Sequence, residues 1–380
     1  MKTELSSKAW GELVQGAEGY PAFVPKRAPR SLDLTREIIA SLDEASNELG
    51  ALRGLGSRLP NPLLVIAPYV RREAVLSSRI EGTQSSMADV YAAEAGQTEL
   101  ITAEDTQEVL NYVHAHDWGL SQLERLPLSL RLIRGVHRTL MQGVRGRERH
   151  PGEFRTYQNW IGGATGEDAV YVPPPPPQMN ELLDDFERFL NERAFPPVIE
   201  AAIAHYQFEA IHPFGDGNGR VGRLLIALLL AERGVMPLPL LYLSAYFERT
   251  RNSYYDGLLR VSTDGDWQGW LRYFLRGVAS QAQAAAESAD RLFQLRESYR
   301  ERLLAARATQ GVLSLVDALF LNPVVDAARA QELLGVSAPT ARAAIRTLED
   351  EGILREVSGR RWRRTYRADE IYAAVAASPE

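Results

Sequence analysis

The sequence gathers a histidine, a carboxylate, two arginines and several glycines within twelve residues, from His212 to Arg223. Pro213 disfavours helical geometry in the residue before it, so we expect a helix to end at His212 and to present the imidazole beside a loop. Glycine lets backbone N–H groups turn inward without a Cβ in the way, and the loop has three such residues (Gly215, Gly217 and Gly219). A histidine in this position could act as a general base next to an anion-binding loop.

The loop leads into a predicted helix, Arg220–Arg233, and a glycine-rich loop at a helix N-terminus binds anions. Arg220 and Arg223 in the first turn oppose the helix dipole, a conflict that bound phosphates would remove. Asp216 supplies a carboxylate, and Mg²⁺ commonly binds one or two carboxylates together with substrate phosphates and water. The segment therefore predicts attack by a hydroxyl group on a nucleotide phosphate, with His212 taking the proton. Each part alone has an ordinary structural explanation, so the interpretation rests on their combination.

The segment resembles the Fic family motif, His-x-Phe-x-Asp/Glu-Gly-Asn-Gly-Arg-x-x-Arg, and meets every fixed position of it. The resemblance implies transfer of AMP from ATP to a Ser, Thr or Tyr hydroxyl of a protein, with release of pyrophosphate. It implies that His212 is the base, that Asp216 holds Mg²⁺, and that the following residues bind ATP: Gly217, Asn218, Gly219, Arg220, Val221, Gly222 and Arg223. The Doc branch, which transfers phosphate, has lysine at the place of Gly219, which argues against kinase activity here.

Three further features are similar to features of this family. Ser77 and Glu81 match an inhibitory motif, Ser/Thr-x-x-x-Glu-Gly/Asn, and their spacing of four places them on one helical face. The resemblance implies that Glu81 pairs with Arg223 and blocks productive placement of the γ-phosphate. Asn159, Trp160, Ile161 and Gly162 begin a predicted hairpin, similar to the flap that docks the target as an added strand. Tyr254 and Tyr255 could wall the adenine pocket, although core packing explains them equally well.

The elements that must position these residues are mainly helical. A helix is expected over Tyr69–Glu81, after a run punctuated by Pro60, Pro62 and Pro68, and it ends at Gly82. Aromatic and β-branched residues around a glycine-rich turn predict strands at 159–161 and 169–172. The other expected helices are Asp105–Leu120, Leu128–Met141, Met179–Arg193, Val198–Ile211, Trp267–Ser280 and a separate polar helix, Gln281–Arg307.

The pattern predicts four regions: an N-terminal helical region (1–120), a catalytic core (121–280), a linker helix (281–308) and a winged helix-turn-helix (309–380). The last is predicted from helices at Asp326–Leu334 and Pro339–Glu351 and a following hairpin, 353–366. Its second helix has Arg342 and Arg346, and its hairpin has six arginines that could contact DNA phosphates (Arg355, Arg360, Arg361, Arg363, Arg364 and Arg367).

Composition narrows the function classes. The 380 residues include no cysteine, which excludes disulfides and thiol catalysis, and the net charge of −6 gives no global attraction to nucleic acid. The N-terminus has no apolar stretch typical of a signal peptide, and no run is long enough to span a bilayer, so we expect a cytoplasmic protein.

Two alternatives stay open at this point. One is a DNA-binding transcriptional regulator whose Fic core senses nucleotide, and the other is an enzyme that removes AMP with the same residues. The sequence does not identify the protein target, which could be the chain itself, and a homodimer is possible for members with this layout.

Overall fold

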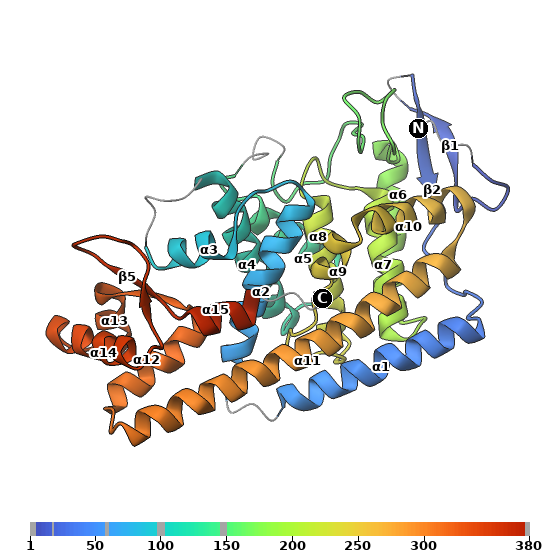
Figure 1. Ribbon diagram of the computed structural model, residues 1–380. Helices are drawn as coiled ribbons and strands as arrows, with labels where there is room; N and C mark the ends of the chain where they lie inside the picture. The colour runs from blue at the N-terminus through green and yellow to red at the C-terminus, as the bar shows by residue number, and fades with distance from the viewer. Residues whose placement is uncertain (1–4, 17–18, 58–60, 97–102, 145–149, 377–380) are drawn as a thin grey trace.

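The computed structural model describes residues 5–16, 19–57, 61–96, 103–144 and 150–376. Helices dominate these residues, and Figure 1 shows that the longest of them, α11 (Trp267–Ala305), runs beside α1 (Arg36–Gly56) along one side of the molecule. No helix among the described residues is long and apolar enough to cross a membrane. The other helices of the N-terminal and central parts are α2 (Leu63–Ile80), α3 (Met87–Glu94), α4 (Ala103–Leu123), α5 (Leu130–Leu140), α6 (Pro176–Glu192), α7 (Pro197–Ile211), α8 (Asn218–Glu232), α9 (Ser244–Arg249) and α10 (Arg251–Asp264).

Helices α7 and α8 form the centre of the core. Nearly every residue of both helices is buried, because their alanine, isoleucine and leucine residues leave no polar face. The two helices pack against each other, and α2, α4 and α5 pack against α8. The first half of the twelve-residue motif is the loop between α7 and α8, residues 212–217, and the second half is the start of α8, so both halves are attached to well-buried helices.

Helix α2 differs from the expected helix. It begins at Leu63 rather than Tyr69, with Pro68 inside it, and it ends at Ile80 with Glu81 as its C-cap residue. Proline removes one helical hydrogen bond, but the turn before it is held in place by the buried side chains of Leu64, Val65 and Ile66. Burial of this turn therefore overrides the proline signal.

The β structure also differs from expectation. The predicted strands at 159–161 and 169–172 do not form a ladder, since the two segments share one isolated bridge, between Ile161 and Tyr171. Gly162 and Gly163 both adopt positive φ directly after this bridge, which turns the chain out of the strand geometry. An N-terminal hairpin that the sequence did not predict, β1 (Gly11–Gln15) and β2 (Pro21–Pro25), lies against the segment and binds it through Phe23 N–H and the carbonyl of Val172 at 2.8 Å.

The two helices expected at 267–280 and 281–307 are one continuous helix, α11. Small buried residues beyond position 280, such as Ala282, Ala285 and Ala289, continue the stripe that packs on its neighbours, so no break is needed. The chain then forms α12 (Gln310–Leu321), β3 (Val324–Asp326), α13 (Ala327–Leu334), α14 (Ala338–Asp350), β4 (Arg355–Glu356), β5 (Thr365–Arg367) and α15 (Asp369–Ala376).

This C-terminal module has an antiparallel sheet with the order β3-β5-β4. Helix α13 ends at Gly335 in the left-handed conformation, as the sequence predicted, whereas β3, α12 and α15 were not predicted. Helices α12 and α15 pack on α2, so the module rests directly on the helix that carries Ser77. Asn322 adds a contact to α3, because its amide donates to the carbonyl of Tyr91 at 3.2 Å.

Candidate active site

The loop between α7 and α8 has an unusual backbone at both ends. His212 follows the last residue of α7 in the left-handed conformation (φ 49°, ψ 59°), which a non-glycine residue rarely adopts. Gly217 precedes α8 with φ 74°, and a Cβ there would lie 2.9 Å from Met141 Sδ. Helix α8 begins at Asn218, two residues before the expected start, so Asn218 and Gly219 belong to its first turn. The N–H groups of this turn have no helical acceptor and are available to an anion.

Buried side chains hold the loop from inside. Asn218 Oδ1 accepts from Phe214 N at 2.8 Å, and its Nδ2 donates to Phe214 O at 2.9 Å. The Phe214 ring stacks on His137 with centroids 3.8 Å apart. His137, which sequence reasoning missed, also hydrogen-bonds the carbonyl of Asp216 at 3.0 Å through Nε2. The loop therefore has a fixed shape before any ligand arrives.

The His212 imidazole is half-buried, and its Nδ1 lacks a hydrogen-bond partner in the structure. Burial and the nearby charge of Arg155 lower its pKa to about 4, against the opposing effect of Glu81. His212 is therefore neutral at pH 7 and can accept a proton.

A cavity of about 630 Å³ opens beside His212, a volume suited to a nucleotide. Its walls come from the motif, from the end of α2, from α10 and from the segment around the Ile161 bridge. They include His212, Gly219, Arg223, Glu81, Tyr254, Tyr255, Ile161, Gly162, Val170, Glu209 and Arg251. The structure thus brings together predicted residues that lie more than 170 positions apart in the chain.

Arg223 and Glu81 meet in this cavity. Arg223 Nη2 lies 2.7 Å from Glu81 Oε1, and Arg223 also donates to Ser77 Oγ at 2.8 Å and Ser77 O at 2.9 Å. A Cβ on Gly219 would lie 2.2 Å from the same Glu81 oxygen, so the carboxylate occupies the space above the first turn of α8. Burial alone would raise the pKa of Glu81, but the charge and hydrogen bond of Arg223 lower it overall, so Glu81 is an anion at neutral pH.

Arg220 has a different environment from Arg223. It is buried, pairs with Glu108 of α4 at 3.0 Å, and does not line the cavity. Glu108 also accepts a hydrogen bond from Thr83 Oγ1 at 3.1 Å. Arg220 therefore fixes the loop to α4. Of the next two motif residues, Val221 is buried in the core and Gly222 lies against Glu209.

Asp216 has the accessibility that a metal ligand needs. Its side chain is 41% exposed, and the contacts to Gly217 N at 2.6 Å and to Arg220 at 3.8 Å both use Oδ1. Among the described residues there is no cluster of three or more His, Cys, Asp or Glu side chains. This donor set fits Mg²⁺ bound mainly by phosphates and water, and it does not fit a cation held by protein ligands alone.

The two tyrosines have separate surroundings. Tyr254 is buried, and its hydroxyl lies 2.8 Å from His205 Nε2, while His205 Nδ1 lies 3.0 Å from the carbonyl of Gly222. Tyr255 is exposed at the cavity wall, beneath the guanidinium of Arg251 at 5.9 Å. The sequence left open whether Tyr254 packs in the core or lines the pocket, and in the structure it does both.

The four predicted flap residues are placed in two ways. Asn159 is buried and donates to the carbonyl of Phe214 at 3.1 Å, which ties the segment to the motif loop. Ile161 and Gly162 line the cavity, and Trp160 is exposed to solvent.

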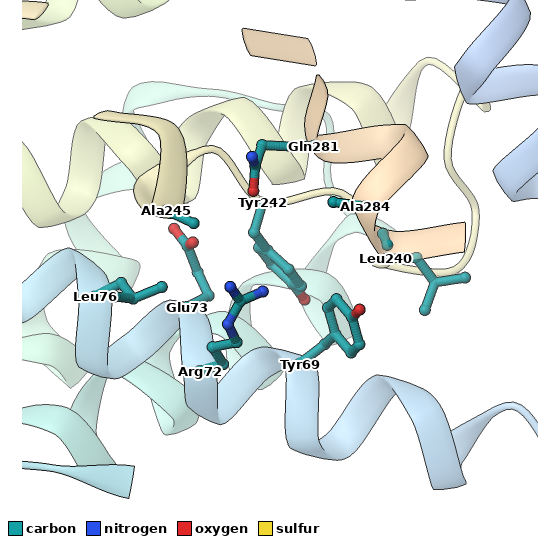
Figure 2. A pocket seen from close by; sticks show the side chains of 10 residues that line it. Tyr69, Arg72, Glu73, Leu76, Leu240, Tyr242, Ala245, Gln281 and Ala284 are labelled. Carbon is teal, nitrogen blue, oxygen red and sulfur yellow. The ribbon is translucent and has the colours of Figure 1, made fainter. Parts of the chain in front are cut away.

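Helix α2 is anchored by a buried carboxylate that sequence reasoning missed. Glu73 accepts from Ser244 Oγ at 2.5 Å and from Tyr112 Oη at 3.1 Å. Figure 2 shows Glu73, Arg72 and Tyr69 directed from α2 toward a small cavity under Tyr242. Glu73, Ser77 and Glu81 lie four residues apart, and this helical stripe is the signal that could have found Glu73.

Glu209 is a second carboxylate that sequence reasoning missed. It lies on α7, three residues before His212, and lines the cavity. Burial raises its pKa to about 8, partly offset by Arg223, and its Oε1 is buried without a hydrogen-bond partner. Glu209 is therefore largely protonated at neutral pH.

Comparison with known proteins agrees with this geometry. Residues 39–121 match the family model described as the Fic/DOC family N-terminal region, and residues 127–230 match the Fic/DOC family model. The second match includes the twelve-residue motif, and the first includes Ser77 and Glu81. Two solved structures share the fold: a Fic family protein from Desulfovibrio desulfuricans G20 (TM-score 0.56, 21% identity, 89% of this chain and 97% of that one) and Fic-1 from C. elegans (TM-score 0.51, 24% identity, 71% and 75%).

Curated relatives carry the name protein adenylyltransferase Fic. The relative from Aedes aegypti is 37% identical over 149 residues, which are 38% of this chain and 27% of that protein. The relative from Drosophila yakuba is 34% identical over 167 residues, or 43% of this chain and 30% of that protein. The chain therefore spans less than a third of the length of these relatives.

Proposed function

We propose that this protein is an adenylyltransferase that moves AMP from ATP to a Ser, Thr or Tyr hydroxyl of a protein. The observation that carries the proposal is the cavity in which a neutral His212 and the guanidinium of Arg223 lie at the N-terminus of α8. The names of the curated relatives support it, and the match to the Fic/DOC family model, residues 127–230, includes the motif.

The proposed reaction is a displacement at the α-phosphorus of ATP. His212 accepts the proton of the target hydroxyl as the hydroxyl oxygen bonds to that phosphorus. The bond from the α-phosphorus to the bridging oxygen breaks, and pyrophosphate leaves. The unpaired N–H groups of the first turn of α8 stabilise the charge that develops on the phosphate oxygens. Asp216 would hold Mg²⁺, which supplies charge neutralisation to the leaving phosphates.

We further propose that Glu81 keeps the enzyme inhibited. Its carboxylate lies over Gly219 and pairs with Arg223, which are the groups that the terminal phosphate of ATP would contact. An anion in this place repels the phosphate and occupies its binding partners. The segment from Asn159 to Gly162 would align the target protein above His212 by backbone pairing.

Labelled ATP tests the activity and its direction. We expect the Glu81→Gly variant to attach label from α-³²P-ATP, but not from γ-³²P-ATP, to proteins of a lysate in a Mg²⁺-dependent way. His212→Ala in that background should lower the rate about 10²- to 10⁴-fold, whereas the exposed His114→Ala should not change it. Transfer of the γ-label, or transfer that survives loss of His212, would contradict the proposal. Release of AMP from a labelled target by the wild type would indicate the reverse, hydrolytic direction.

A second function is favoured by the surface of the C-terminal module, which we propose to be a DNA-binding winged helix. Arg342 and Arg346 are exposed on one face of α14. The hairpin loop exposes Arg361, Arg363 and Trp362, the last at 79% of its surface, while Arg355 and Arg367 pair with Asp369. The protein should retard duplex DNA in a gel at low salt, and this binding should weaken as the salt concentration rises. Unshifted DNA at the lowest salt would remove this function.

A further inference from the structure

Arg155 is a buried arginine that the function described above does not use. It lies before the flap segment, and only 4% of its surface is exposed. Its guanidinium binds carbonyl groups: Nε donates to His212 O at 2.9 Å, Nη1 to Tyr157 O at 3.0 Å, and Nη2 to Pro174 O at 2.7 Å and Ile211 O at 3.4 Å. Burial lowers its pKa to about 10, so it keeps its charge at neutral pH.

Two of these contacts cap the helix that presents His212. The last carbonyls of a helix have no intrahelical partner, and the C-terminal end of its dipole favours a cation. Arg155 supplies both the hydrogen-bond donors and the positive charge, because its guanidinium binds the carbonyls of Ile211 and His212. Its backbone N–H also donates to Pro213 O at 2.9 Å. A helix end commonly uses glycine for the left-handed position that His212 occupies here, so this backbone needs outside support.

The other two contacts hold the flap segment at both ends. Tyr157 lies just before the predicted docking residues, and Pro174 lies just after the returning strand. One rigid, planar group thus joins the beginning and the end of the flap to the catalytic histidine. All four acceptors of these hydrogen bonds are backbone carbonyl oxygens, so the guanidinium binds the backbone and not a carboxylate.

We propose that Arg155 is a positioning residue for AMP transfer, which fixes the backbone of His212 relative to the flap and places a positive charge near its imidazole. The inference rests on the proposed function, since it assigns Arg155 a role in the same reaction. The charges that act on His212 are those of Arg155, from the segment before the flap, and Glu81, from α2, and the backbone of Glu209 on α7 also hydrogen-bonds it. The carboxyl of Glu209 and the guanidinium of Arg223, on α8, line the same cavity. Of these groups, Arg155 is the one whose positive charge lowers the pKa of His212.

The test compares Arg155→Lys and Arg155→Gln in the Glu81→Gly background, with Arg138→Gln as a matched control on an exposed arginine. Lysine keeps the positive charge but not the planar set of hydrogen-bond donors of the guanidinium, and glutamine loses the charge. We expect kcat to fall about tenfold in the lysine variant and about a hundredfold in the glutamine variant, with the KM for ATP changed less than about twofold. The His212 ring, identified in NMR spectra by comparison with His212→Ala, should titrate at higher pH in Arg155→Gln only.

Several results would overturn the inference. One is a kcat in Arg155→Gln within about twofold of its parent. Another is an equal fall in kcat in both variants with an unchanged pKa of His212, which would show that Arg155 only stabilises the fold. If Arg155→Gln does not fold, Arg155→Lys still decides between a fall in kcat and none. A Glu81→Gly parent that transfers no AMP would contradict the proposed function instead, and the NMR titration would still test Arg155.

Discussion

The two walls of the cavity are built differently. The motif loop is held by buried groups from several elements, among them Asn218, His137 and Arg220. The facing wall is the end of α2, where Glu81 lines the cavity. The Glu81 side chain is 34% exposed and accepts a hydrogen bond from Arg223. The groups proposed to do chemistry are therefore fixed, and the group proposed to block them can leave by rotating its own side chain.

The exchange of partners on Arg223 explains why such a block can be reversible. Removing one partner of a buried ion pair leaves an uncompensated charge, which costs about 3–5 kcal/mol. Arg223 is 98% covered, but a phosphate that replaces Glu81 supplies the lost charge and hydrogen bonds. The free-energy difference between the blocked and the loaded state is then small compared with the strength of either contact.

The largest expected effect is on the fixed wall. Glu108→Ala should lower the free energy of unfolding by about 3–5 kcal/mol, because it removes the buried carboxylate that pairs with Arg220 at 3.0 Å and leaves only the partly exposed Asp216 at 3.8 Å. Urea denaturation measures the change. Glu104→Ala, an exposed carboxylate on the same helix, should stay within about 0.5 kcal/mol of the wild type. Equal stability of the two variants would show that the loop is not braced through Arg220.

The next largest effect is expected at the end of α2, where a substitution should raise activity rather than lower stability. Glu81→Gly should raise the rate of AMP transfer by roughly 5- to 150-fold, the range of a coupling energy of about 1–3 kcal/mol. Glu81→Gln, which keeps the shape but loses the charge, should give an intermediate increase. Rates come from incorporation of α-³²P label. If neither variant is faster than the wild type, the pairing with Arg223 is not inhibitory.

A smaller increase is expected for Ser77→Ala. Arg223 loses the hydrogen bond to the Ser77 hydroxyl but keeps the Ser77 carbonyl and Glu81. If the inhibited state loses about 1 kcal/mol of stability with this hydrogen bond, the rate should rise roughly two- to fivefold. Ser78→Ala is the control, since its buried hydroxyl has no hydrogen-bond partner in the structure. A slower Ser77→Ala enzyme would mean that Ser77 positions Arg223 for catalysis.

The smallest effect concerns pH. His212 has a pKa of about 4 in place of the usual value near 6.5, so it stays neutral and able to accept a proton as the pH falls from 7 to 5.5. The kcat of the Glu81→Gly variant should change less than about twofold over this range. Because Glu81 raises the pKa of His212, its removal should move the fall in kcat below pH 4. A decrease centred near pH 6.5 would show that His212 has an ordinary pKa in the active enzyme.

Local pattern predicted the helices around the motif well and the weaker elements poorly. Helices α7 and α13 begin and end within about two residues of expectation, because their apolar spacing and their proline or glycine boundaries are local signals. The pattern was wrong about the start of α2, the break in α11 and the two flap strands. Burial against other elements decides each of these.

The sequence alone determined which chemical groups the cavity contains, because His212, Asp216, Gly219 and Arg223 lie within one continuous segment whose spacing is set by a helix end, a loop and a helix start. Only the tertiary structure decided that Arg223 faces the cavity while Arg220 turns to Glu108, and that Arg155 holds the carbonyl of His212. Those partners come from elements 50 to 150 residues away, and contacts over such separations depend on how helices pack rather than on the local order of residues.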